Sequence, residues 1–77
     1  MNENNKARLD KLIRRVLNVS TITPDLAMGK TVQWDSLKHV ELLAEIDSEF
    51  GVDVDPTLMW KMTSVAGIVE VLSKFVD

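Results

Sequence analysis

The sequence predicts an all-α fold, a bundle of three longer helices and one short helix with a long loop between the first two. Three observations support this class. Apolar residues recur at the helical period of 3.6 residues in three separate segments. Residues that typically start and stop helices bracket those segments. The alternation typical of a strand appears only briefly, at Val52-Asp53-Val54.

The first helix is expected over about residues 3–18. Its apolar residues fall at positions i, i+3, i+4, i+7 and i+8 and are Leu9, Leu12, Ile13, Val16 and Leu17. Charged residues mostly fill the opposite face, and an asparagine near the start can act as the N-terminal cap. This pattern predicts an amphipathic helix that packs through one face.

The long loop, residues 19–35, interrupts the helical period with turn-forming residues. Thr23 as cap and Pro24 as the first helical residue predict a short turn within it. A long loop in a small domain usually packs on the rest of the domain or has a function. We therefore expect its large apolar side chains to lie over the bundle: Leu26, Met28, Val32 and Trp34.

The second long helix is expected to begin at Asp35 or Ser36, since either residue can cap it. Gly51 ends it as a left-handed cap. Its broad apolar face consists of Leu37, Val40, Leu42, Leu43, Ile46 and Phe50. Val52 and Val54 follow in an extended link.

The remaining chain predicts one short and one longer helix. Asp55-Pro56 opens a short helical segment over residues 57–62, and Thr63-Ser64 caps the last helix. The apolar stripe of that helix is Val65, Ile68, Val69, Leu72, Phe75 and Val76. Helices this short do not persist alone in water, so each must dock on the others. The length and the lack of a linker predict one domain over residues 1–77.

Composition excludes several classes of protein. The absence of cysteine rules out a disulfide framework and a cysteine-based metal site, and one histidine with scattered carboxylates does not match another metal site. No apolar run approaches the roughly 20 residues that span a bilayer. The first five residues lack the features of a signal peptide. We therefore expect a cytoplasmic protein with no membrane span.

The net charge of −3 is unevenly distributed. Residues 6–15 carry Lys6, Arg8, Lys11, Arg14 and Arg15 against Asp10. Residues 35–55 carry seven acidic residues against Lys38. The acidic region favours a basic partner, and the acidic balance argues against binding to nucleic acid. We interpret the basic stretch as a solvated helix face.

Asp35-Ser36-Leu37 stands where the long loop meets an amphipathic helix. A serine hydroxyl there lies near the positive end of the helix dipole and near unpaired backbone N–H groups, which favours a phosphate ester. A neighbouring carboxylate can hold a divalent cation during phosphoryl transfer. The alternative is structural, because both Asp and Ser are common caps, and a tripeptide alone does not separate the two.

The sequence around this tripeptide closely resembles the acyl carrier protein family. The resemblance covers residues 35–72 well and the first helix more loosely. The family has Asp-Ser-Leu at the start of its second helix, an acidic apolar helix that ends in Glu-Phe-Gly, an extended link, a short helix and a final helix. Here these parts occur in the same order, and the likeness continues through Val54, Pro56, Met62, Thr63 and Val65. The resemblance implies an acyl-carrier-like four-helix bundle.

The resemblance also implies a function. Ser36 would receive 4'-phosphopantetheine from coenzyme A, attached by a phosphopantetheinyl transferase that uses magnesium, and Asp35 would assist the metal in that complex. The thiol of this arm would hold acyl intermediates as thioesters. The chain would then be a monomeric carrier, not an enzyme. It would serve acyl-loading ligase or synthase enzymes of fatty-acid, lipid or polyketide-type synthesis.

The resemblance assigns two further groups of residues. Partner enzymes would contact the start of the second helix through Leu37, Lys38, Val40, Glu41 and Glu45. An acyl pocket would lie among Leu42, Leu43, Ile46, Val54, Met62 and Ile68. For this second group an ordinary hydrophobic core is the alternative, because an aliphatic stripe packs inside a bundle by default.

The sequence departs from the family pattern near Ser36. Gln33 stands where the family often has Gly, Trp34 where it has a small residue, and Lys38 where it often has an acid. With Lys38 and His39, the second helix begins less acidic, which predicts a specialised carrier with a dedicated ligase or a secondary pathway. Trp34 either packs over the loop or touches the arm, and Trp60 is a candidate partner contact.

Three other functions are alternatives to the acyl carrier. A Ser36–His39 pair acting as nucleophile and base lacks a third group to orient the histidine, which disfavours catalysis. An aminoacyl or peptidyl cargo of a secondary pathway stays open, because the loading enzyme sets the cargo. An unmodified helical interaction module, in which Asp35-Ser36 is only a cap, also stays open.

Overall fold

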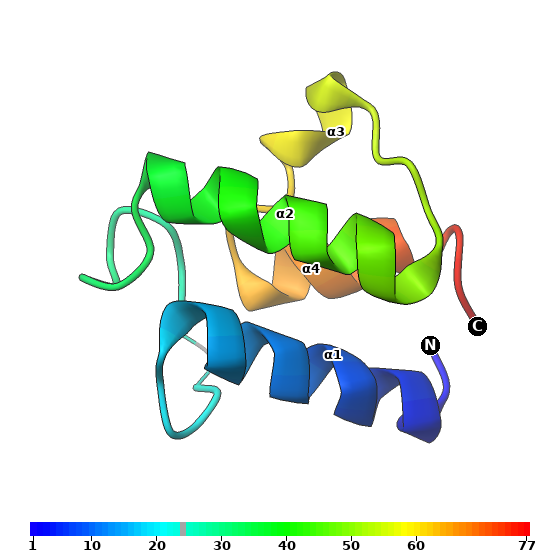
Figure 1. Ribbon diagram of the computed structural model, residues 1–77, viewed down its shortest axis with the longest axis horizontal. Helices are drawn as coiled ribbons and strands as arrows, with labels where there is room; N and C mark the ends of the chain where they lie inside the picture. The colour runs from blue at the N-terminus through cyan, green and yellow to red at the C-terminus, as the bar shows by residue number, and fades with distance from the viewer. Residues whose placement is uncertain (24) are drawn as a thin grey trace.

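The computed structural model describes residues 1–23 and 25–77, and four helices form in this part of the chain. They are α1 (Glu3–Leu17), α2 (Ser36–Phe50), α3 (Pro56–Met59) and α4 (Val65–Leu72). In Figure 1, α1 runs alongside α2, α4 lies behind α2, and α3 lies on the side of α2 away from α1. The described residues form two isolated bridges but no strand. The predicted all-α, acyl-carrier-like fold is confirmed.

Local capping explains where the helices begin and end. The side chain of Asn2 accepts a hydrogen bond from the Asn5 N–H at 2.8 Å. Asp35 accepts from the Lys38 N–H at 2.8 Å, so the cap of α2 is Asp35 and not Ser36. At the other end, α2 stops at Gly51 in the left-handed conformation, with φ of 65°. The bounds of the first two helices therefore lie within one residue of those predicted.

A mainly aliphatic core joins the helices. Leu9, Leu12, Ile13 and Leu17 of α1 pack with Leu42, Leu43 and Ile46 of α2 and with Ile68, Val71 and Leu72 of α4. Leu26, Trp34 and Met62 complete this core from the connecting segments. No residue of α3 is fully buried. None of the described helices has the length and apolar character needed to cross a membrane.

The loop between α1 and α2 packs on the bundle through most of its apolar residues. Leu26 and Trp34 are buried and Met28 is half-buried, as predicted. Val32, in contrast, is 94% exposed, and the prediction for this residue was wrong. Turn hydrogen bonds at Thr31 explain the difference, because Thr31 bonds back to Ala27 and forward to Trp34 and leaves Val32 on the outside.

Further bonds fix this loop to the residues that lead into α4. The Met28 N–H donates to the Thr63 carbonyl at 2.8 Å, and Ala27 pairs with Ser64 in an isolated bridge. The loop therefore has its own hydrogen-bonded structure up to the start of α2. The turn predicted at Thr23-Pro24 involves Pro24, which lies outside the described residues.

The end of α4 differs from the sequence prediction. The apolar stripe predicted a helix that extends to Val76, but α4 ends at Leu72. The Ser73 hydroxyl donates to the Val69 carbonyl, and the Phe75 N–H bonds to the Leu72 carbonyl, so the chain tightens into a turn. As a result Phe75 is half-exposed, while Val76 still packs against the core.

The two ends of the chain meet. The Asn2 N–H donates to the Asp77 carbonyl oxygen at 2.6 Å, and the Asn5 side-chain amide donates to the same oxygen at 3.0 Å. Figure 1 places both ends near the C-terminal end of α2, at the opposite end of that helix from Ser36.

Candidate functional site

Ser36 is the first residue of α2 and is exposed. Asp35, the cap, uses one carboxylate oxygen, Oδ1, for the Lys38 N–H. The backbone N–H groups of Ser36 and Leu37 form no hydrogen bond within residues 1–23 and 25–77. A hydroxyl and two available amides thus lie together at the positive end of the dipole of a 15-residue helix. This arrangement favours an anion, such as a phosphate ester, at Ser36.

Two buried rings flank this exposed serine. Trp34 and His39 are both fully buried, and the Trp34 indole Nε1–H donates to His39 Nδ1 at 3.1 Å. His39 Nε2 lies 2.8 Å from the Met59 carbonyl oxygen. Of the two roles left open for Trp34, packing inside the bundle is the one observed.

The sequence-based placement of His39 was wrong. We expected it to reduce the acidity of the surface beside Ser36, but it is buried, and both ring nitrogens have partners in the protein. A pair of Ser36 and His39 as nucleophile and base does not form, because neither ring nitrogen is available. The available sequence signal for this contact is that an unusual Trp34 and the one histidine of the chain, His39, lie on either side of the helix start.

The residues expected to contact partners gather next to Ser36. Leu37 is 80% exposed and Val40 is 50% exposed. The apolar period places both in the buried face of the second helix, and this prediction is wrong for these two residues, because only the later apolar residues of α2 turn into the core. An open groove of about 420 Å³ is lined by Asp35, Leu37, Lys38, Val40 and Glu41. Glu45 lies one turn farther along α2.

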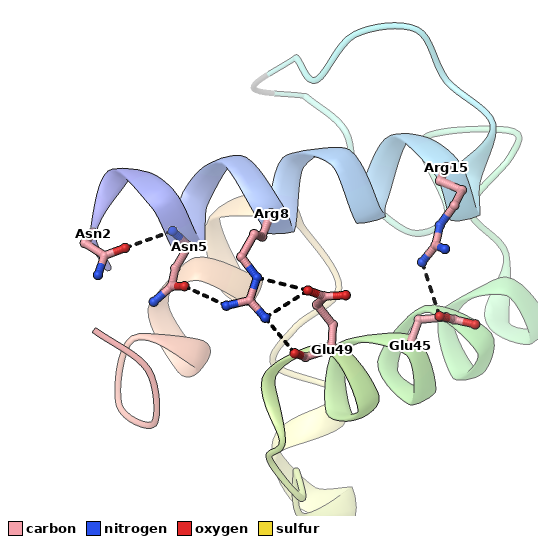
Figure 2. Close-up of polar contacts among 6 residues, drawn as sticks. All are labelled: Asn2, Asn5, Arg8, Arg15, Glu45 and Glu49. Atoms are coloured by element: carbon pink, nitrogen blue, oxygen red, sulfur yellow. Dashed lines mark hydrogen bonds and ion pairs between the residues drawn. The ribbon is translucent and has the colours of Figure 1, made fainter.

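The acidic residues of α2 are largely paired within the protein. Glu41, Glu45 and Glu49 recur every four residues and so share one stripe of the helix. Lys38 Nζ lies 2.8 Å from Glu41, Arg15 lies 3.2 Å from Glu45, and Arg8 lies 2.8 Å from Glu49. Figure 2 shows the two pairs that join α1 to α2.

These ion pairs modify two sequence-based interpretations. The basic stretch of α1 is not entirely a solvated face, because Arg8 and Arg15 turn toward α2. Arg8 also donates to the Glu49 carbonyl at 2.7 Å and lies over the Phe50 ring, 4.7 Å from its centroid. The acidic stripe, in turn, does not face a partner as bare negative charge.

The residues expected to form an acyl pocket are mostly core residues. Leu42, Leu43, Ile46, Met62 and Ile68 are buried, and Val54 is half-buried. Leu43 and Val54 also line a groove of about 200 Å³ between α2 and the segment before and within α3, whose other lining residues are Val40, Ala44, Asp47, Pro56 and Met59. The remaining four members of the set do not line it.

Sequence reasoning missed Asp47 as a member of this groove. Its Oδ1 atom is buried and has no hydrogen-bond partner among the described residues. Burial raises the pKa of the Asp47 carboxyl, a backbone hydrogen bond from Val54 opposes that rise, and the neighbouring charge of Asp53 adds to it. The position of Asp47 four residues after the buried Leu43 was the available signal.

Comparison with known proteins agrees with this geometry. A family model described as "Phosphopantetheine attachment site" matches residues 7–72. An acyl carrier protein from Rickettsia bellii (strain OSU 85-389) is 36% identical over 56 residues, which cover 73% of this chain and 69% of that protein. No solved structure shows a significant match. Since the family model spans from α1 to the last residue of α4, this chain belongs to the acyl carrier protein family and contains its phosphopantetheine attachment domain.

Proposed function

We propose that the protein carries acyl groups rather than catalysing a reaction, and that Ser36 is the residue that bears 4'-phosphopantetheine. The observation that supports Ser36 is its exposure at the start of α2, beside two backbone amides that have no hydrogen-bond partner in the described part of the chain. Ser64 and Ser73 are less suitable, because the Ser64 hydroxyl caps α4 and the Ser73 hydroxyl donates to Val69.

The attachment step assigns roles to three residues of this chain. Ser36 Oγ forms a bond to phosphorus while a P–O bond in the pyrophosphate of coenzyme A breaks, so the nucleotide part leaves and the hydroxyl proton passes to a base of the transferase. The amides of Ser36 and Leu37 stabilise the new phosphodiester charge. Asp35 keeps one carboxylate oxygen free of the cap and offers it to magnesium in the transferase complex. Once attached, the arm supplies the thiol that this cysteine-free chain lacks.

The proposed partner surface begins at Ser36 and follows α2. Leu37 and Val40 offer exposed apolar contacts, and Lys38, Glu41 and Glu45 surround them with charge of both signs. We propose that a phosphopantetheinyl transferase and acyl-loading ligase or synthase enzymes dock there. The carrier is proposed to act as a monomeric single domain in the cytoplasm.

The position of Lys38 supports a specialised carrier. It is bound to Glu41, so the first turn of α2 presents no net negative charge from this pair to a partner. An enzyme that recognises an acidic helix start would lose a contact here. We propose a dedicated ligase within fatty-acid, lipid or polyketide-type synthesis.

The acyl chain is proposed to enter along the groove lined by Leu43 and Val54. That groove is open at the surface, while the other predicted pocket residues are packed in the core. Entry would require α3 to move away from α2, and α3 is the helix without a fully buried residue.

Mass spectrometry tests the central proposal. The protein is incubated with coenzyme A, magnesium and a broad-range phosphopantetheinyl transferase. One added arm is expected on the wild type and on Ser48→Ala, a matched change at an exposed serine of the same helix. None is expected on Ser36→Ala. An unmodified wild type would instead support the helical interaction module.

Loading assays separate the cargo classes once the arm is attached. Candidate ligases for fatty acyl, aminoacyl and polyketide units are offered to the modified protein. We expect an acyl ligase to form the thioester, and exclusive loading by an amino-acid-activating enzyme would support the aminoacyl or peptidyl alternative.

A further inference from the structure

A hydrogen-bonded chain, Trp34–His39–Met59, links three segments of the molecule. Trp34 lies next to the last residue of the long loop, His39 lies in the first turn of α2, and Met59 is the last residue of α3. The ring centroids of Trp34 and His39 are 5.9 Å apart, and those of His39 and Trp60 are 5.8 Å apart. His39 is therefore the point at which the loop, α2 and the end of α3 are joined.

The chemistry of the indole fixes the state of the imidazole. An indole Nε1–H can only donate, so His39 Nδ1 must be the acceptor and carries no proton. The proton of the neutral ring then lies on Nε2, which donates to the Met59 carbonyl. Both nitrogens of a fully buried ring are thereby satisfied, and the ring has one allowed orientation.

The Trp34–His39 bond closes a short loop around Ser36. Asp35, Ser36 and Leu37 are exposed, while the residues that flank them, Trp34 and His39, are fully buried and bonded to each other. The Trp34 backbone is held as well, through its N–H to Thr31 and its carbonyl to Gly29. This closure sets the direction in which Ser36 points.

The His39–Met59 bond holds α3 against α2. α3 has four residues, too few for a helix to be stable by itself. The Met59 carbonyl oxygen at its end accepts a turn hydrogen bond from the Met62 N–H at 3.2 Å, and His39 Nε2 adds a second, shorter contact at 2.8 Å. The α3 segment is thus tied to the turn that presents Ser36.

We propose that His39 is a positioning residue that holds the Ser36 turn through Trp34 and α3 through Met59. A partner that modifies or reads Ser36 then meets α3 beside it as long as the bond between His39 and Met59 is formed. The inference rests on the proposed function of Ser36. It goes beyond that function by assigning a role to a residue three positions away that touches neither the arm nor the transferred phosphorus.

Two substitutions separate the halves of this arrangement. An Asn side chain places its carbonyl oxygen where Nδ1 lies, so His39→Asn retains an acceptor for the Trp34 indole but does not reach Met59. A Gln side chain places its NH₂ group where Nε2 lies, so His39→Gln retains a donor for Met59. His39→Leu removes both bonds, and Trp34→Phe removes only the indole donor.

The experiment measures Ser36 modification kinetics and amide hydrogen exchange in these four variants. We expect kcat for Ser36 modification to fall about ten-fold in His39→Leu, His39→Gln and Trp34→Phe, as misplacement of a reacting group does. It should stay within about two-fold of wild type in His39→Asn, because the acceptor for Trp34 is retained. Exchange in α3 should accelerate in His39→Leu and His39→Asn but not in His39→Gln. Nitrogen-15 shifts of the wild-type ring should show the proton on Nε2.

Opposite responses in the Asn and Gln variants distinguish positioning from a general structural role. Effects that simply follow thermal stability across the four variants would overturn the proposal, as would a ring protonated on Nδ1. If His39→Leu fails to fold, the contrast between Asn and Gln still decides. If wild-type Ser36 is never modified, the proposed function fails, while the ring shifts and the α3 exchange still test the hydrogen-bonded chain.

Discussion

Helix α2 packs against α1 on one face and against α3 on another, and different interactions hold the two contacts. The face toward α1 carries Glu41, Glu45 and Glu49, two of which pair with arginines of α1 above an aliphatic core. The face toward α3 carries His39, Leu43 and Asp47, also at intervals of four residues. There a four-residue helix is held by a few specific contacts.

This difference indicates that the α1 face of α2 contributes most of the stability, while the α3 face can change conformation more easily. Burial of apolar side chains stabilises the α1 face, and exposed ion pairs add little to it. The α3 face includes a groove, a carboxylate oxygen without a hydrogen-bond partner among the described residues, and a helix without a fully buried residue, so we expect it to open at a lower free-energy cost. A carrier built in this way can change one side of α2 without unfolding the other.

The largest expected effect is a loss of stability when the core on the α1 side of α2 is truncated. Ile13→Ala removes a fully buried side chain and should lower the free energy of unfolding by about 2–5 kcal/mol. Leu58→Ala, in α3, removes a half-buried side chain and should cost about 1 kcal/mol. Urea titrations followed by circular dichroism measure both. Equal losses would show that the two faces share one stability.

A smaller effect concerns Asp47. Burial raises the pKa of this carboxyl in the folded protein, so its ionisation opposes folding, and its contribution to stability is lost as pH rises through that raised pKa. Asp47→Asn should therefore be more stable than wild type at pH 7, and the gain should disappear in acid, below the usual range of an Asp carboxyl. Thermal unfolding of both proteins at each pH measures the difference.

The variant comparison isolates Asp47 from other carboxyls. Hydrogen bonds from Thr23 and Thr57 lower the pKa values of Asp25 and Asp55, so their contributions are present above the usual range and are lost as pH falls. They are the same in both proteins and cancel in the difference. A gain that is constant with pH would contradict the assignment to ionisation of Asp47.

The ion pairs of the α1 face should contribute less to the free energy of unfolding than the buried core residues do. Arg15→Gln breaks the contact with Glu45 and should cost about 0.2–1 kcal/mol of stability at low salt. Lys11→Gln is the matched control, because Lys11 lies on the same helix and forms no ion pair within residues 1–23 and 25–77. Added salt should reduce the difference between the two variants. A salt-independent difference would point to packing of the arginine stem instead.

The smallest change in stability is expected at Lys38, where the readout is partner choice. Lys38→Asp replaces the cation beside Ser36 with an acid in the first turn of α2, a change of a few tenths of a kcal/mol. Turnover with general fatty-acid enzymes should improve, because the helix start then presents only negative charge. Unchanged turnover would count against a specialised carrier.

Features encoded in neighbouring residues could be predicted from the sequence. The cap at Asn2, the end of α2 at Gly51 and the exposed Ser36 depend on local chemistry and on the apolar period. Contacts between distant segments could not, since Arg15 and Glu45 are 30 residues apart and nothing local pairs them. Val32 was misplaced because its exposure depends on turns at Thr31 that apolar character does not reveal.

The candidate site, too, has features that the sequence predicts and features that depend on contacts between distant segments. The resemblance placed Ser36, Asp35 and the exposed Leu37 at the start of α2, where they are observed. It did not reveal that His39 is buried, because a histidine at a helix start is usually exposed and only the three-dimensional path of the loop brings Trp34 to it. The groove beside Asp47 depends likewise on how the link after Gly51 folds back.

The meeting of Asn2 with Asp77 has a practical consequence. A fluorophore, an affinity tag or a surface anchor joined to either end would project from the side where α2 finishes, at the opposite end of that helix from the serine. Immobilised in that orientation, each molecule would present Ser36 to solution. Transferases and ligases could then be compared on the same anchored sample without the anchor obstructing them.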